Sequence, residues 1–104
     1  MILSTTDTIE GKKIVKHIGL VRGNTIRARH IGRDIMAGLK NLVGGEISDY
    51  TKMMAESREQ AIDRMVEQAD ELGANAIVGL KFSTSMVMQM ASEILVYGTA
   101  VIVK

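Results

Sequence analysis

Hydrophobic positions in the last thirty residues of the chain follow the two-residue period of β-strands. The first strand, residues 75–88, is predicted to have one apolar face, formed by Ala76, Val78, Leu80, Phe82, Met86 and Met88. The second strand is apolar on both sides, with Leu95, Tyr97, Val101 and Val103 on one face and Ile94, Val96, Ala100 and Ile102 on the other. Strands with this pattern are usually buried on both faces. The other expected elements are too few to cover both, so the pattern predicts an obligate oligomer.

Two further stretches near the N-terminus have the pattern of strands. Residues 2–6 form a short β-prone stretch, and residues 13–23 alternate as a full strand does. Turns are expected at Gly11, at Gly23 and, between the last two strands, at Ala91-Ser92. The expected sheet is therefore antiparallel and three-stranded.

Apolar residues in the middle of the chain recur at helical spacing. A short helix is expected over residues 31–43, ending at Gly44 and Gly45, where positive φ commonly closes a helix. A longer amphipathic helix is expected over residues 50–72, with Gly73 just after its end. The order strand, short helix, long helix, strand, strand predicts an α+β fold with its helices on one sheet face.

The composition is that of one small domain spanning residues 1–104. One Phe, two Tyr, no Trp and a net charge of +1 argue against a nucleic-acid or membrane partner. The absence of Cys excludes disulfides and thiolate metal sites and fits a reducing compartment. No run of about 18 apolar residues and no signal-like N-terminus is visible, so a cytoplasmic location is expected.

Three methionines alternate along one segment, Met86, Met88 and Met90. On a regular strand their thioethers project to the same side, and soft sulfur ligands select Cu(I). Methionine is also a flexible filler of cores and interfaces, and we favour that interpretation. Binding of a soft metal ion by these three methionines remains the alternative.

The two histidines, His17 and His30, are the chain's only imidazoles. Their spacing does not match a zinc pattern, so a metal site would need added carboxylates or several subunits. His17 lies in an expected strand, where a partly buried, satisfied histidine is the favoured interpretation.

One basic cluster is present, and it comprises Arg22, Arg27, Arg29, His30 and Arg33. A small anionic ligand could bind there, aided by backbone N–H groups if a helix begins near Gly32. The favoured alternative is a contact between subunits, because the helix expected over residues 50–72 carries six acidic and three basic residues. No P-loop, Ser-His-Asp set or carboxylate pair is discernible.

A set of short motifs spans the chain, and their order and spacing resemble the YbjQ-like family. They are Ser4-Thr5-Thr6, Ile9-Glu10-Gly11, Arg33-Asp34, Gly38, Val43-Gly44-Gly45, Tyr50, Leu72 to Gly79 and Tyr97 to Val101. The resemblance implies a dodecin-like β-α-β-β subunit that assembles as a homopentameric ring, with short extra strands joining neighbours. The family also carries a heavy-metal-binding label, although this chain lacks cysteine.

Several residues of this chain match the motif positions of the family, and we expect them to shape a ligand site or a subunit interface. These residues are Arg33, Asp34, Gly44, Gly45 and Tyr50, together with the neighbouring His30. Three functions stay open. The favoured one is a homo-oligomeric scaffold or small-ligand module, the second is soft-metal binding, and the third is an enzyme with a composite intersubunit site.

Overall fold

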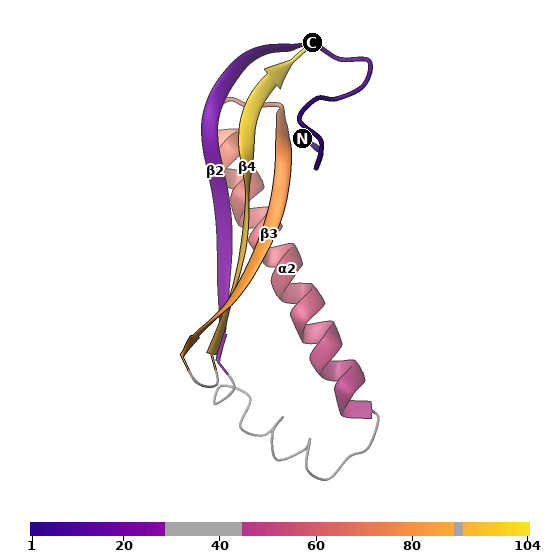
Figure 1. Ribbon diagram of the computed structural model, residues 1–104, viewed down its shortest axis with the longest axis vertical. Helices are drawn as coiled ribbons and strands as arrows, with labels where there is room; N and C mark the ends of the chain where they lie inside the picture. The colour runs from indigo at the N-terminus through magenta and orange to yellow at the C-terminus, as the bar shows by residue number, and fades with distance from the viewer. Residues whose placement is uncertain (29–44, 89–90) are drawn as a thin grey trace.

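The computed structural model describes residues 1–28, 45–88 and 91–104, which form one long helix and a four-stranded sheet (Figure 1). The elements are β1 (Ile2–Leu3), β2 (Ile14–Ala28), α2 (Gly45–Glu71), β3 (Ala76–Met88) and β4 (Ala91–Val103). The strand order is β1-β3-β4-β2. Strand β4 pairs antiparallel with both β2 and β3, whereas β1 runs parallel to β3. The α+β class is confirmed, but the sheet is mixed and four-stranded.

Strand β2 is longer than its sequence pattern predicts, because it continues through Gly23. This glycine pairs with Val96 inside the ladder, so the expected turn there is wrong. Helix α2 explains the glycine, since a Cβ at this position would lie 2.6 Å from the Met65 backbone nitrogen. Gly23 thus allows close approach of a helix to a strand. Gly11, with φ +79°, does lie in the expected turn.

The connection between the last two strands is shorter than expected, because β4 already begins at Ala91. Ala91 pairs with Met88 and Ser92 pairs with Met86, so both belong to β4 and the predicted turn at these two residues is wrong. The short helix expected over residues 31–43 lies outside the described residues.

Helix α2 begins at Gly45, five residues before the predicted start at Tyr50, and it ends close to the predicted position. Gly73 has φ +84°, and its N–H donates to the Asp70 carbonyl oxygen at 3.0 Å. The Ala74 N–H donates to the Ala69 carbonyl oxygen at 3.1 Å. These bonds satisfy carbonyl groups that every helix end leaves without a partner, so Gly73 closes the helix as predicted.

Two apolar clusters lie on opposite faces of the sheet. The first lies between α2 and the sheet and comprises Val21, Ala61, Met65, Ala69, Ala74, Ile77, Leu80, Ile94, Val96 and Ala100. In the second, Ala76, Val78, Val101 and Val103 are covered by Ile2, Ile9 and Ile14. Strand β4 is therefore apolar on both faces as predicted. Part of the cover for its second face comes from the chain's own N-terminal segment, a contact that the hydrophobic pattern does not predict.

Strand β3 changes face at Gly79. This residue has φ +63°, and the pairing with β4 shifts register between Val78 and Lys81. Because an inserted residue reverses the side-chain alternation, Ile77 and Leu80 face the helix whereas Val78 faces the opposite side. The prediction of a single apolar face along β3 is therefore wrong.

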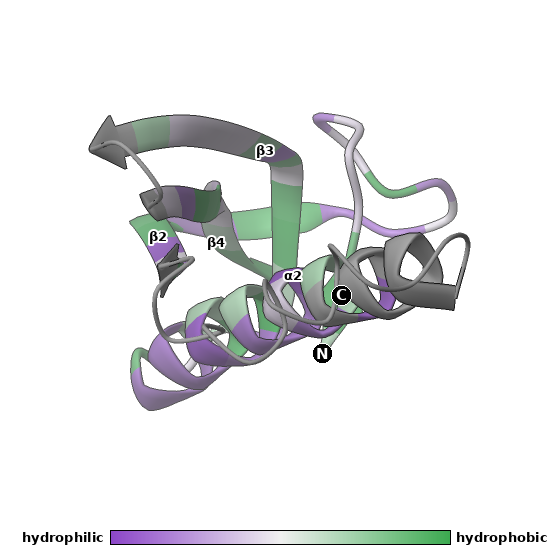
Figure 2. Cartoon of the chain, turned by 90° about the horizontal axis from the view of Figure 1, so that it is seen from below, coloured by the Kyte–Doolittle hydropathy of each residue, from purple (hydrophilic) through white to green (hydrophobic). Residues whose placement is uncertain are grey.

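Hydrophilic residues follow the outer side of α2, and hydrophobic residues lie on its side toward the strands (Figure 2). The helix packs mainly on β2 and β4 and scarcely touches β3. Within the described ranges, no helix is long and apolar enough to cross a membrane.

Candidate functional site

The structure describes only part of the predicted site. His30, Arg33, Asp34 and Gly44 fall in residues 29–44, which lie outside the described residues, as does Met90. Gly45 is the first residue of α2, and Tyr50 follows in the second turn of the helix. The grouping of these residues into one ligand or interface site therefore stays a prediction.

An apolar strip occupies the sheet face that points away from α2. It consists of Leu20, Ile26, Leu95 and Tyr97, of which Leu20 is 65% and Ile26 is 56% exposed, whereas the other two are half-buried. All four share one face because β2 and β4 pair in register, with Leu20 opposite Thr99 and Ile26 opposite Glu93. The N-terminal segment packs on this face near Ala76, Val78, Val101 and Val103.

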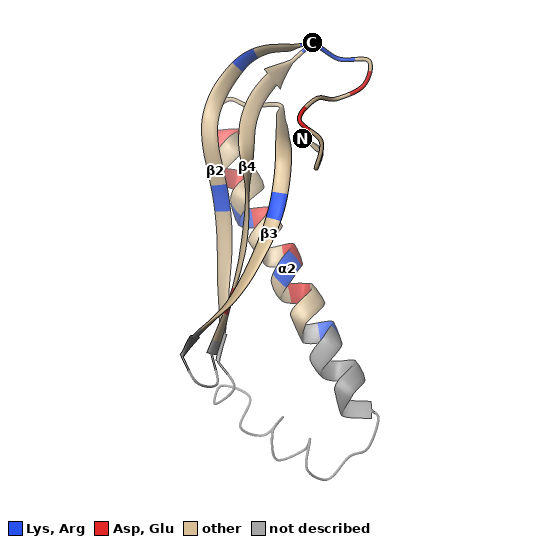
Figure 3. Cartoon of the chain, in the orientation of Figure 1, with Lys and Arg blue, Asp and Glu red and all other residues tan. Residues whose placement is uncertain are grey.

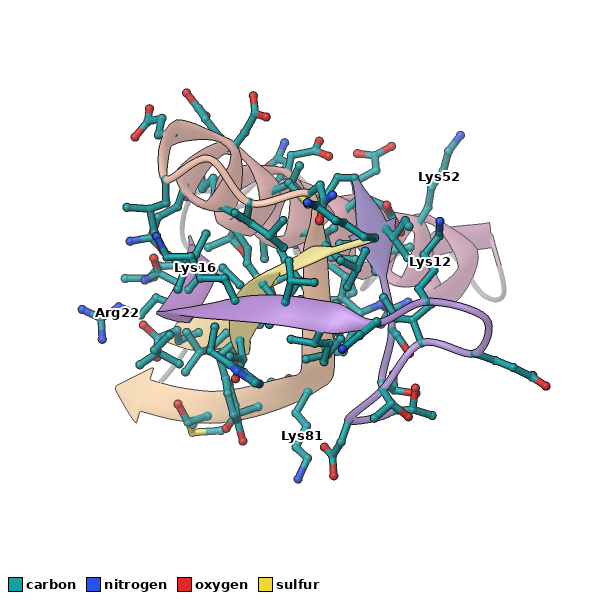
Figure 4. All side chains as sticks on the ribbon, turned by 90° about the horizontal axis from the view of Figure 1, so that it is seen from above. Lys12, Lys16, Arg22, Lys52 and Lys81 are labelled. Carbon is teal, nitrogen blue, oxygen red and sulfur yellow. The ribbon has the colours of Figure 1, made fainter. Side chains whose placement is uncertain are left out.

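Two cations flank Tyr97 on this strip. Arg22 is the partner of Tyr97 in β2, and Lys81 is its partner in β3, so the three residues form one row across three strands. Both cations are exposed, and they extend away from the sheet in different directions (Figure 4). The sequence pattern indicated Arg22 but missed Lys81. Only the register of β3 against β4, set by the bulge at Gly79, brings Lys81 beside Tyr97.

The outer surface of α2 has the opposite charge. Among the side chains of α2 that the structure describes, exposed acidic residues outnumber exposed basic residues by six to three. The acids are Glu56, Glu59, Asp63, Glu67, Asp70 and Glu71, and the bases are Lys52, Arg58 and Arg64. Lys and Arg mark β2 and β3, whereas α2 carries Asp and Glu together with Lys and Arg (Figure 3). The molecule therefore has a cationic strand side and an anionic helix side.

Side chains of α2 bind the outer edge of β2. The Arg22 backbone N–H donates to Gln68 Oε1 at 2.8 Å, and Arg64 Nη1 donates to the Asn24 carbonyl oxygen at 2.5 Å. About two helical turns closer to the start of α2, Thr25 Oγ1 donates to the Ser57 carbonyl oxygen at 3.3 Å. These bonds fix the middle of β2 against the helix and occupy two of the backbone groups that an edge strand normally leaves unpaired.

The predicted soft-metal residues are only partly placed. Met86 lies in β3 and is 73% exposed. The pairing with β4 shifts register between Met86 and Met88, which interrupts the regular alternation on which a shared thioether side depends. The strand geometry therefore does not place the thioethers of all three methionines on one side of the strand.

His17 is exposed, contrary to the expectation of a partly buried histidine. It pairs with Val101, whereas Met86 pairs with Ser92, nine positions away along β4. At roughly 3.3 Å per residue this separation is about 30 Å, so these two side chains cannot share an ion within one subunit. Among the residues that the structure describes, no group of three His, Cys, Asp or Glu side chains could hold a metal ion.

Comparisons with known proteins agree with the family indicated by the motifs. A model of the YbjQ family, described as "Putative heavy-metal-binding", matches residues 1–104. A UPF0145 protein of Dehalococcoides mccartyi is 61% identical over 104 residues, with all of both chains covered. A UPF0145 protein of Methanosarcina acetivorans is 59% identical over 97% of this chain and 95% of that protein.

A crystal structure shows the same fold. The protein comes from Pediococcus pentosaceus, belongs to the DUF74 family and has unknown function. The superposition covers the whole of this chain and 98% of the Pediococcus chain, with a TM-score of 0.67. The two sequences are 20% identical. At that identity the likeness supports the α+β fold.

Proposed function

Because this chain belongs to the YbjQ-like family, we propose that it is a homo-oligomeric scaffold or small-ligand-binding module whose dodecin-like subunits close into a pentameric ring. The observation that carries the proposal is the extended shape of the subunit. Its radius of gyration is 17.0 Å. A compact domain of about 100 residues has a radius near 13 Å. An elongated subunit buries less of its surface than a compact domain of the same length does. Contact with a neighbouring subunit would bury the remainder.

Exposed apolar side chains support the same conclusion. Leu20 and Ile26 project from one sheet face, while Phe82 and Met86 project from the other and are 45% and 73% exposed. Phe82 pairs with the buried Val96 and so shares the face of α2, but the helix scarcely reaches β3. Apolar residues gathered on two faces are typical of subunit contacts.

Charge complementarity favours a head-to-tail contact. The cationic strand side, with Arg22 and Lys81, matches the anionic helix side of a second subunit. A contact between two different surfaces generates a closed ring when the rotation between subunits closes. The number five rests on the family resemblance.

A small anionic ligand is the favoured occupant of such an assembly. The row of Arg22, Tyr97 and Lys81 offers two cations and a phenol on an apolar surface. Arginine and lysine bind carboxylate or phosphate groups through charge-assisted hydrogen bonds. A subunit interface would supply the enclosure that one exposed sheet face lacks.

Native mass spectrometry of untagged protein tests this proposal first. We expect an assembly whose subunit number is a multiple of five, and a stoichiometric additional mass would identify a retained ligand or ion. Leu20→Lys/Ile26→Lys should shift the population toward smaller species, because charges placed in an apolar contact must be desolvated. Leu72→Lys, at a site 50% exposed beyond the end of α2, is the matched control. A wild-type monomer at micromolar concentration would contradict the proposal.

Soft-metal binding through Met86, Met88 and Met90 is the second candidate. The high exposure of Met86 favours it, since a ligand must be reachable by the ion. Replacing all three residues with Leu should preserve secondary structure and abolish Cu(I) uptake, because leucine keeps the volume and removes the sulfur. Met65→Leu, which removes a fully buried sulfur, should leave uptake unchanged. Equal Cu(I) uptake by the triple variant and the wild type would exclude these residues as ligands.

A further inference from the structure

The edges of β2 and β3 that point away from β4 differ in how they are protected. The edge of β2 is bound by Gln68 and Arg64 of α2 at Arg22 and Asn24. The edge of β3 is covered at one end only, where β1 pairs with Ala76 and Ile77. Backbone bonds from the N-terminal segment extend this cover as far as Leu80, whose N–H donates to the Ser4 carbonyl oxygen at 3.1 Å.

Beyond Leu80, no strand in the described part of the chain pairs with this edge of β3. In an antiparallel ladder, the backbone groups of successive residues point alternately toward one neighbour and the other. The Leu80 N–H points outward, so the N–H and C=O groups of Phe82, Thr84 and Met86 also point outward. An uncovered row of such groups is a template for adding a strand.

The sequence along this edge is complementary to itself. Residues 82–86 read Phe-Ser-Thr-Ser-Met, which is apolar, Ser, Thr, Ser, apolar in either direction. Antiparallel pairing of two copies about Thr84 therefore sets Phe82 of one copy opposite Met86 of the other. It also sets Ser83 opposite Ser85 and brings no like charges together. Such cross-strand pairs are favourable, and the two apolar side chains are exposed in the single subunit.

We propose that residues 82–86 of β3 form a two-fold contact with the same segment of a second copy, which joins two sheets into one continuous sheet. The outward pairs Phe82–Met86, Thr84–Thr84 and Met86–Phe82 each close with two backbone hydrogen bonds. This contact is separate from the head-to-tail ring contact proposed above, since it uses one edge twice, whereas a ring contact uses two different surfaces. Together with a five-membered ring it produces an even-numbered assembly.

The assembly state and amide exchange of the wild-type protein test the contact without any substitution. Native mass spectrometry should give a species with an even number of subunits. The amides of Phe82, Thr84 and Met86 should exchange at least about tenfold more slowly at high than at low protein concentration. The amides of Ser83 and Ser85, which point toward β4, should show no such dependence. An odd-numbered assembly with fast-exchanging Thr84 amides would overturn the proposal and leave the ring intact.

Thr84→Pro removes the central outward N–H and places a ring at the edge, which an edge strand tolerates. It should halve the mass of the assembly, whereas Thr84→Ala keeps the N–H and should preserve the mass. A second variant, Phe82→Lys/Met86→Lys, blocks the edge with charge and leaves the backbone unchanged. If the wild-type protein forms only a dimer and no ring, the ring proposal alone is contradicted. If both edge-blocking variants keep an even-numbered assembly, the edge contact is contradicted.

Discussion

Gly23→Ala is expected to lower the free energy of unfolding by about 3 kcal/mol or more, which is at the upper end for overpacking. A Cβ at this position overlaps the Ala61 carbonyl oxygen and lies 2.6 Å from the Met65 backbone nitrogen. Both atoms belong to the helix backbone, so no side chain can rotate away. The helix must move off β2, and such a movement also lengthens the hydrogen bonds from Arg22 and Thr25 to α2.

Chemical denaturation at fixed protein concentration measures this effect, because association shifts apparent stability. Gly11→Ala is the matched control. Gly11 has φ +79° but no atom within 4 Å of an added Cβ. Its substitution costs only the strain of a left-handed residue, roughly 1–2 kcal/mol. Equal losses in the two variants would show that the close approach of α2 to β2 is not what excludes a side chain from position 23.

Met65→Ala is the second large effect, with an expected loss of about 2–5 kcal/mol. Met65 is fully buried and lies in the cluster between α2 and the sheet, together with Val21, Ile77 and Val96. Truncation removes buried apolar surface and leaves a cavity, and close-packed neighbours refill such a cavity only in part. The lost free energy should appear as a lower denaturation midpoint with an unchanged slope.

Met86→Ala serves as the control for this variant because it removes the same atoms from a residue that is 73% exposed in the single subunit. In the isolated subunit its effect should stay within about 0.5 kcal/mol. A destabilisation that grows with protein concentration is expected in addition from the contact proposed for residues 82–86. A loss at Met65 no larger than that at Met86 would contradict the assignment of Met65 to the core.

Local patterns predicted the elements whose burial follows the chain's own periodicity. The two apolar faces of β4 and the apolar stripe of α2 were both evident, because each element is long and regular. Gly73 was recognised as a helix end because positive φ after a helix is a local requirement. The α+β class followed from the order of these elements.

The features that the sequence did not predict depend on contacts between distant segments. Gly23 has the appearance of a turn residue, and only the passage of α2 over β2 shows that it lies within a strand. The reversal of β3 at Gly79 comes from pairing with β4 and with the N-terminal segment. The parallel pairing of β1 with β3 joins residues that no local pattern relates.

The candidate site was predictable only in part for the same reason. Arg22 was identified from its basic neighbours in the sequence, whereas Lys81 and Tyr97 join it through strand register. The proposed contact at Thr84 depends on hydrogen bonds between β3 and the N-terminal segment. The bond from the Leu80 N–H to the Ser4 carbonyl oxygen shows which β3 amides point outward. A hydrophobic pattern does not contain this information.

The position of β1 has a consequence for the order of folding. Ile2 and Leu3 pair with Ala76 and Ile77, so the first residues of the chain can join the sheet only after β3 is present. Closing so long a loop is slow compared with forming the β3–β4 hairpin, whose partners are near neighbours in sequence. We expect the hairpin and α2 to form first and the N-terminal segment to dock last. During synthesis, Val101 and Val103 would therefore gain their cover from Ile2 and Ile9 as the final step.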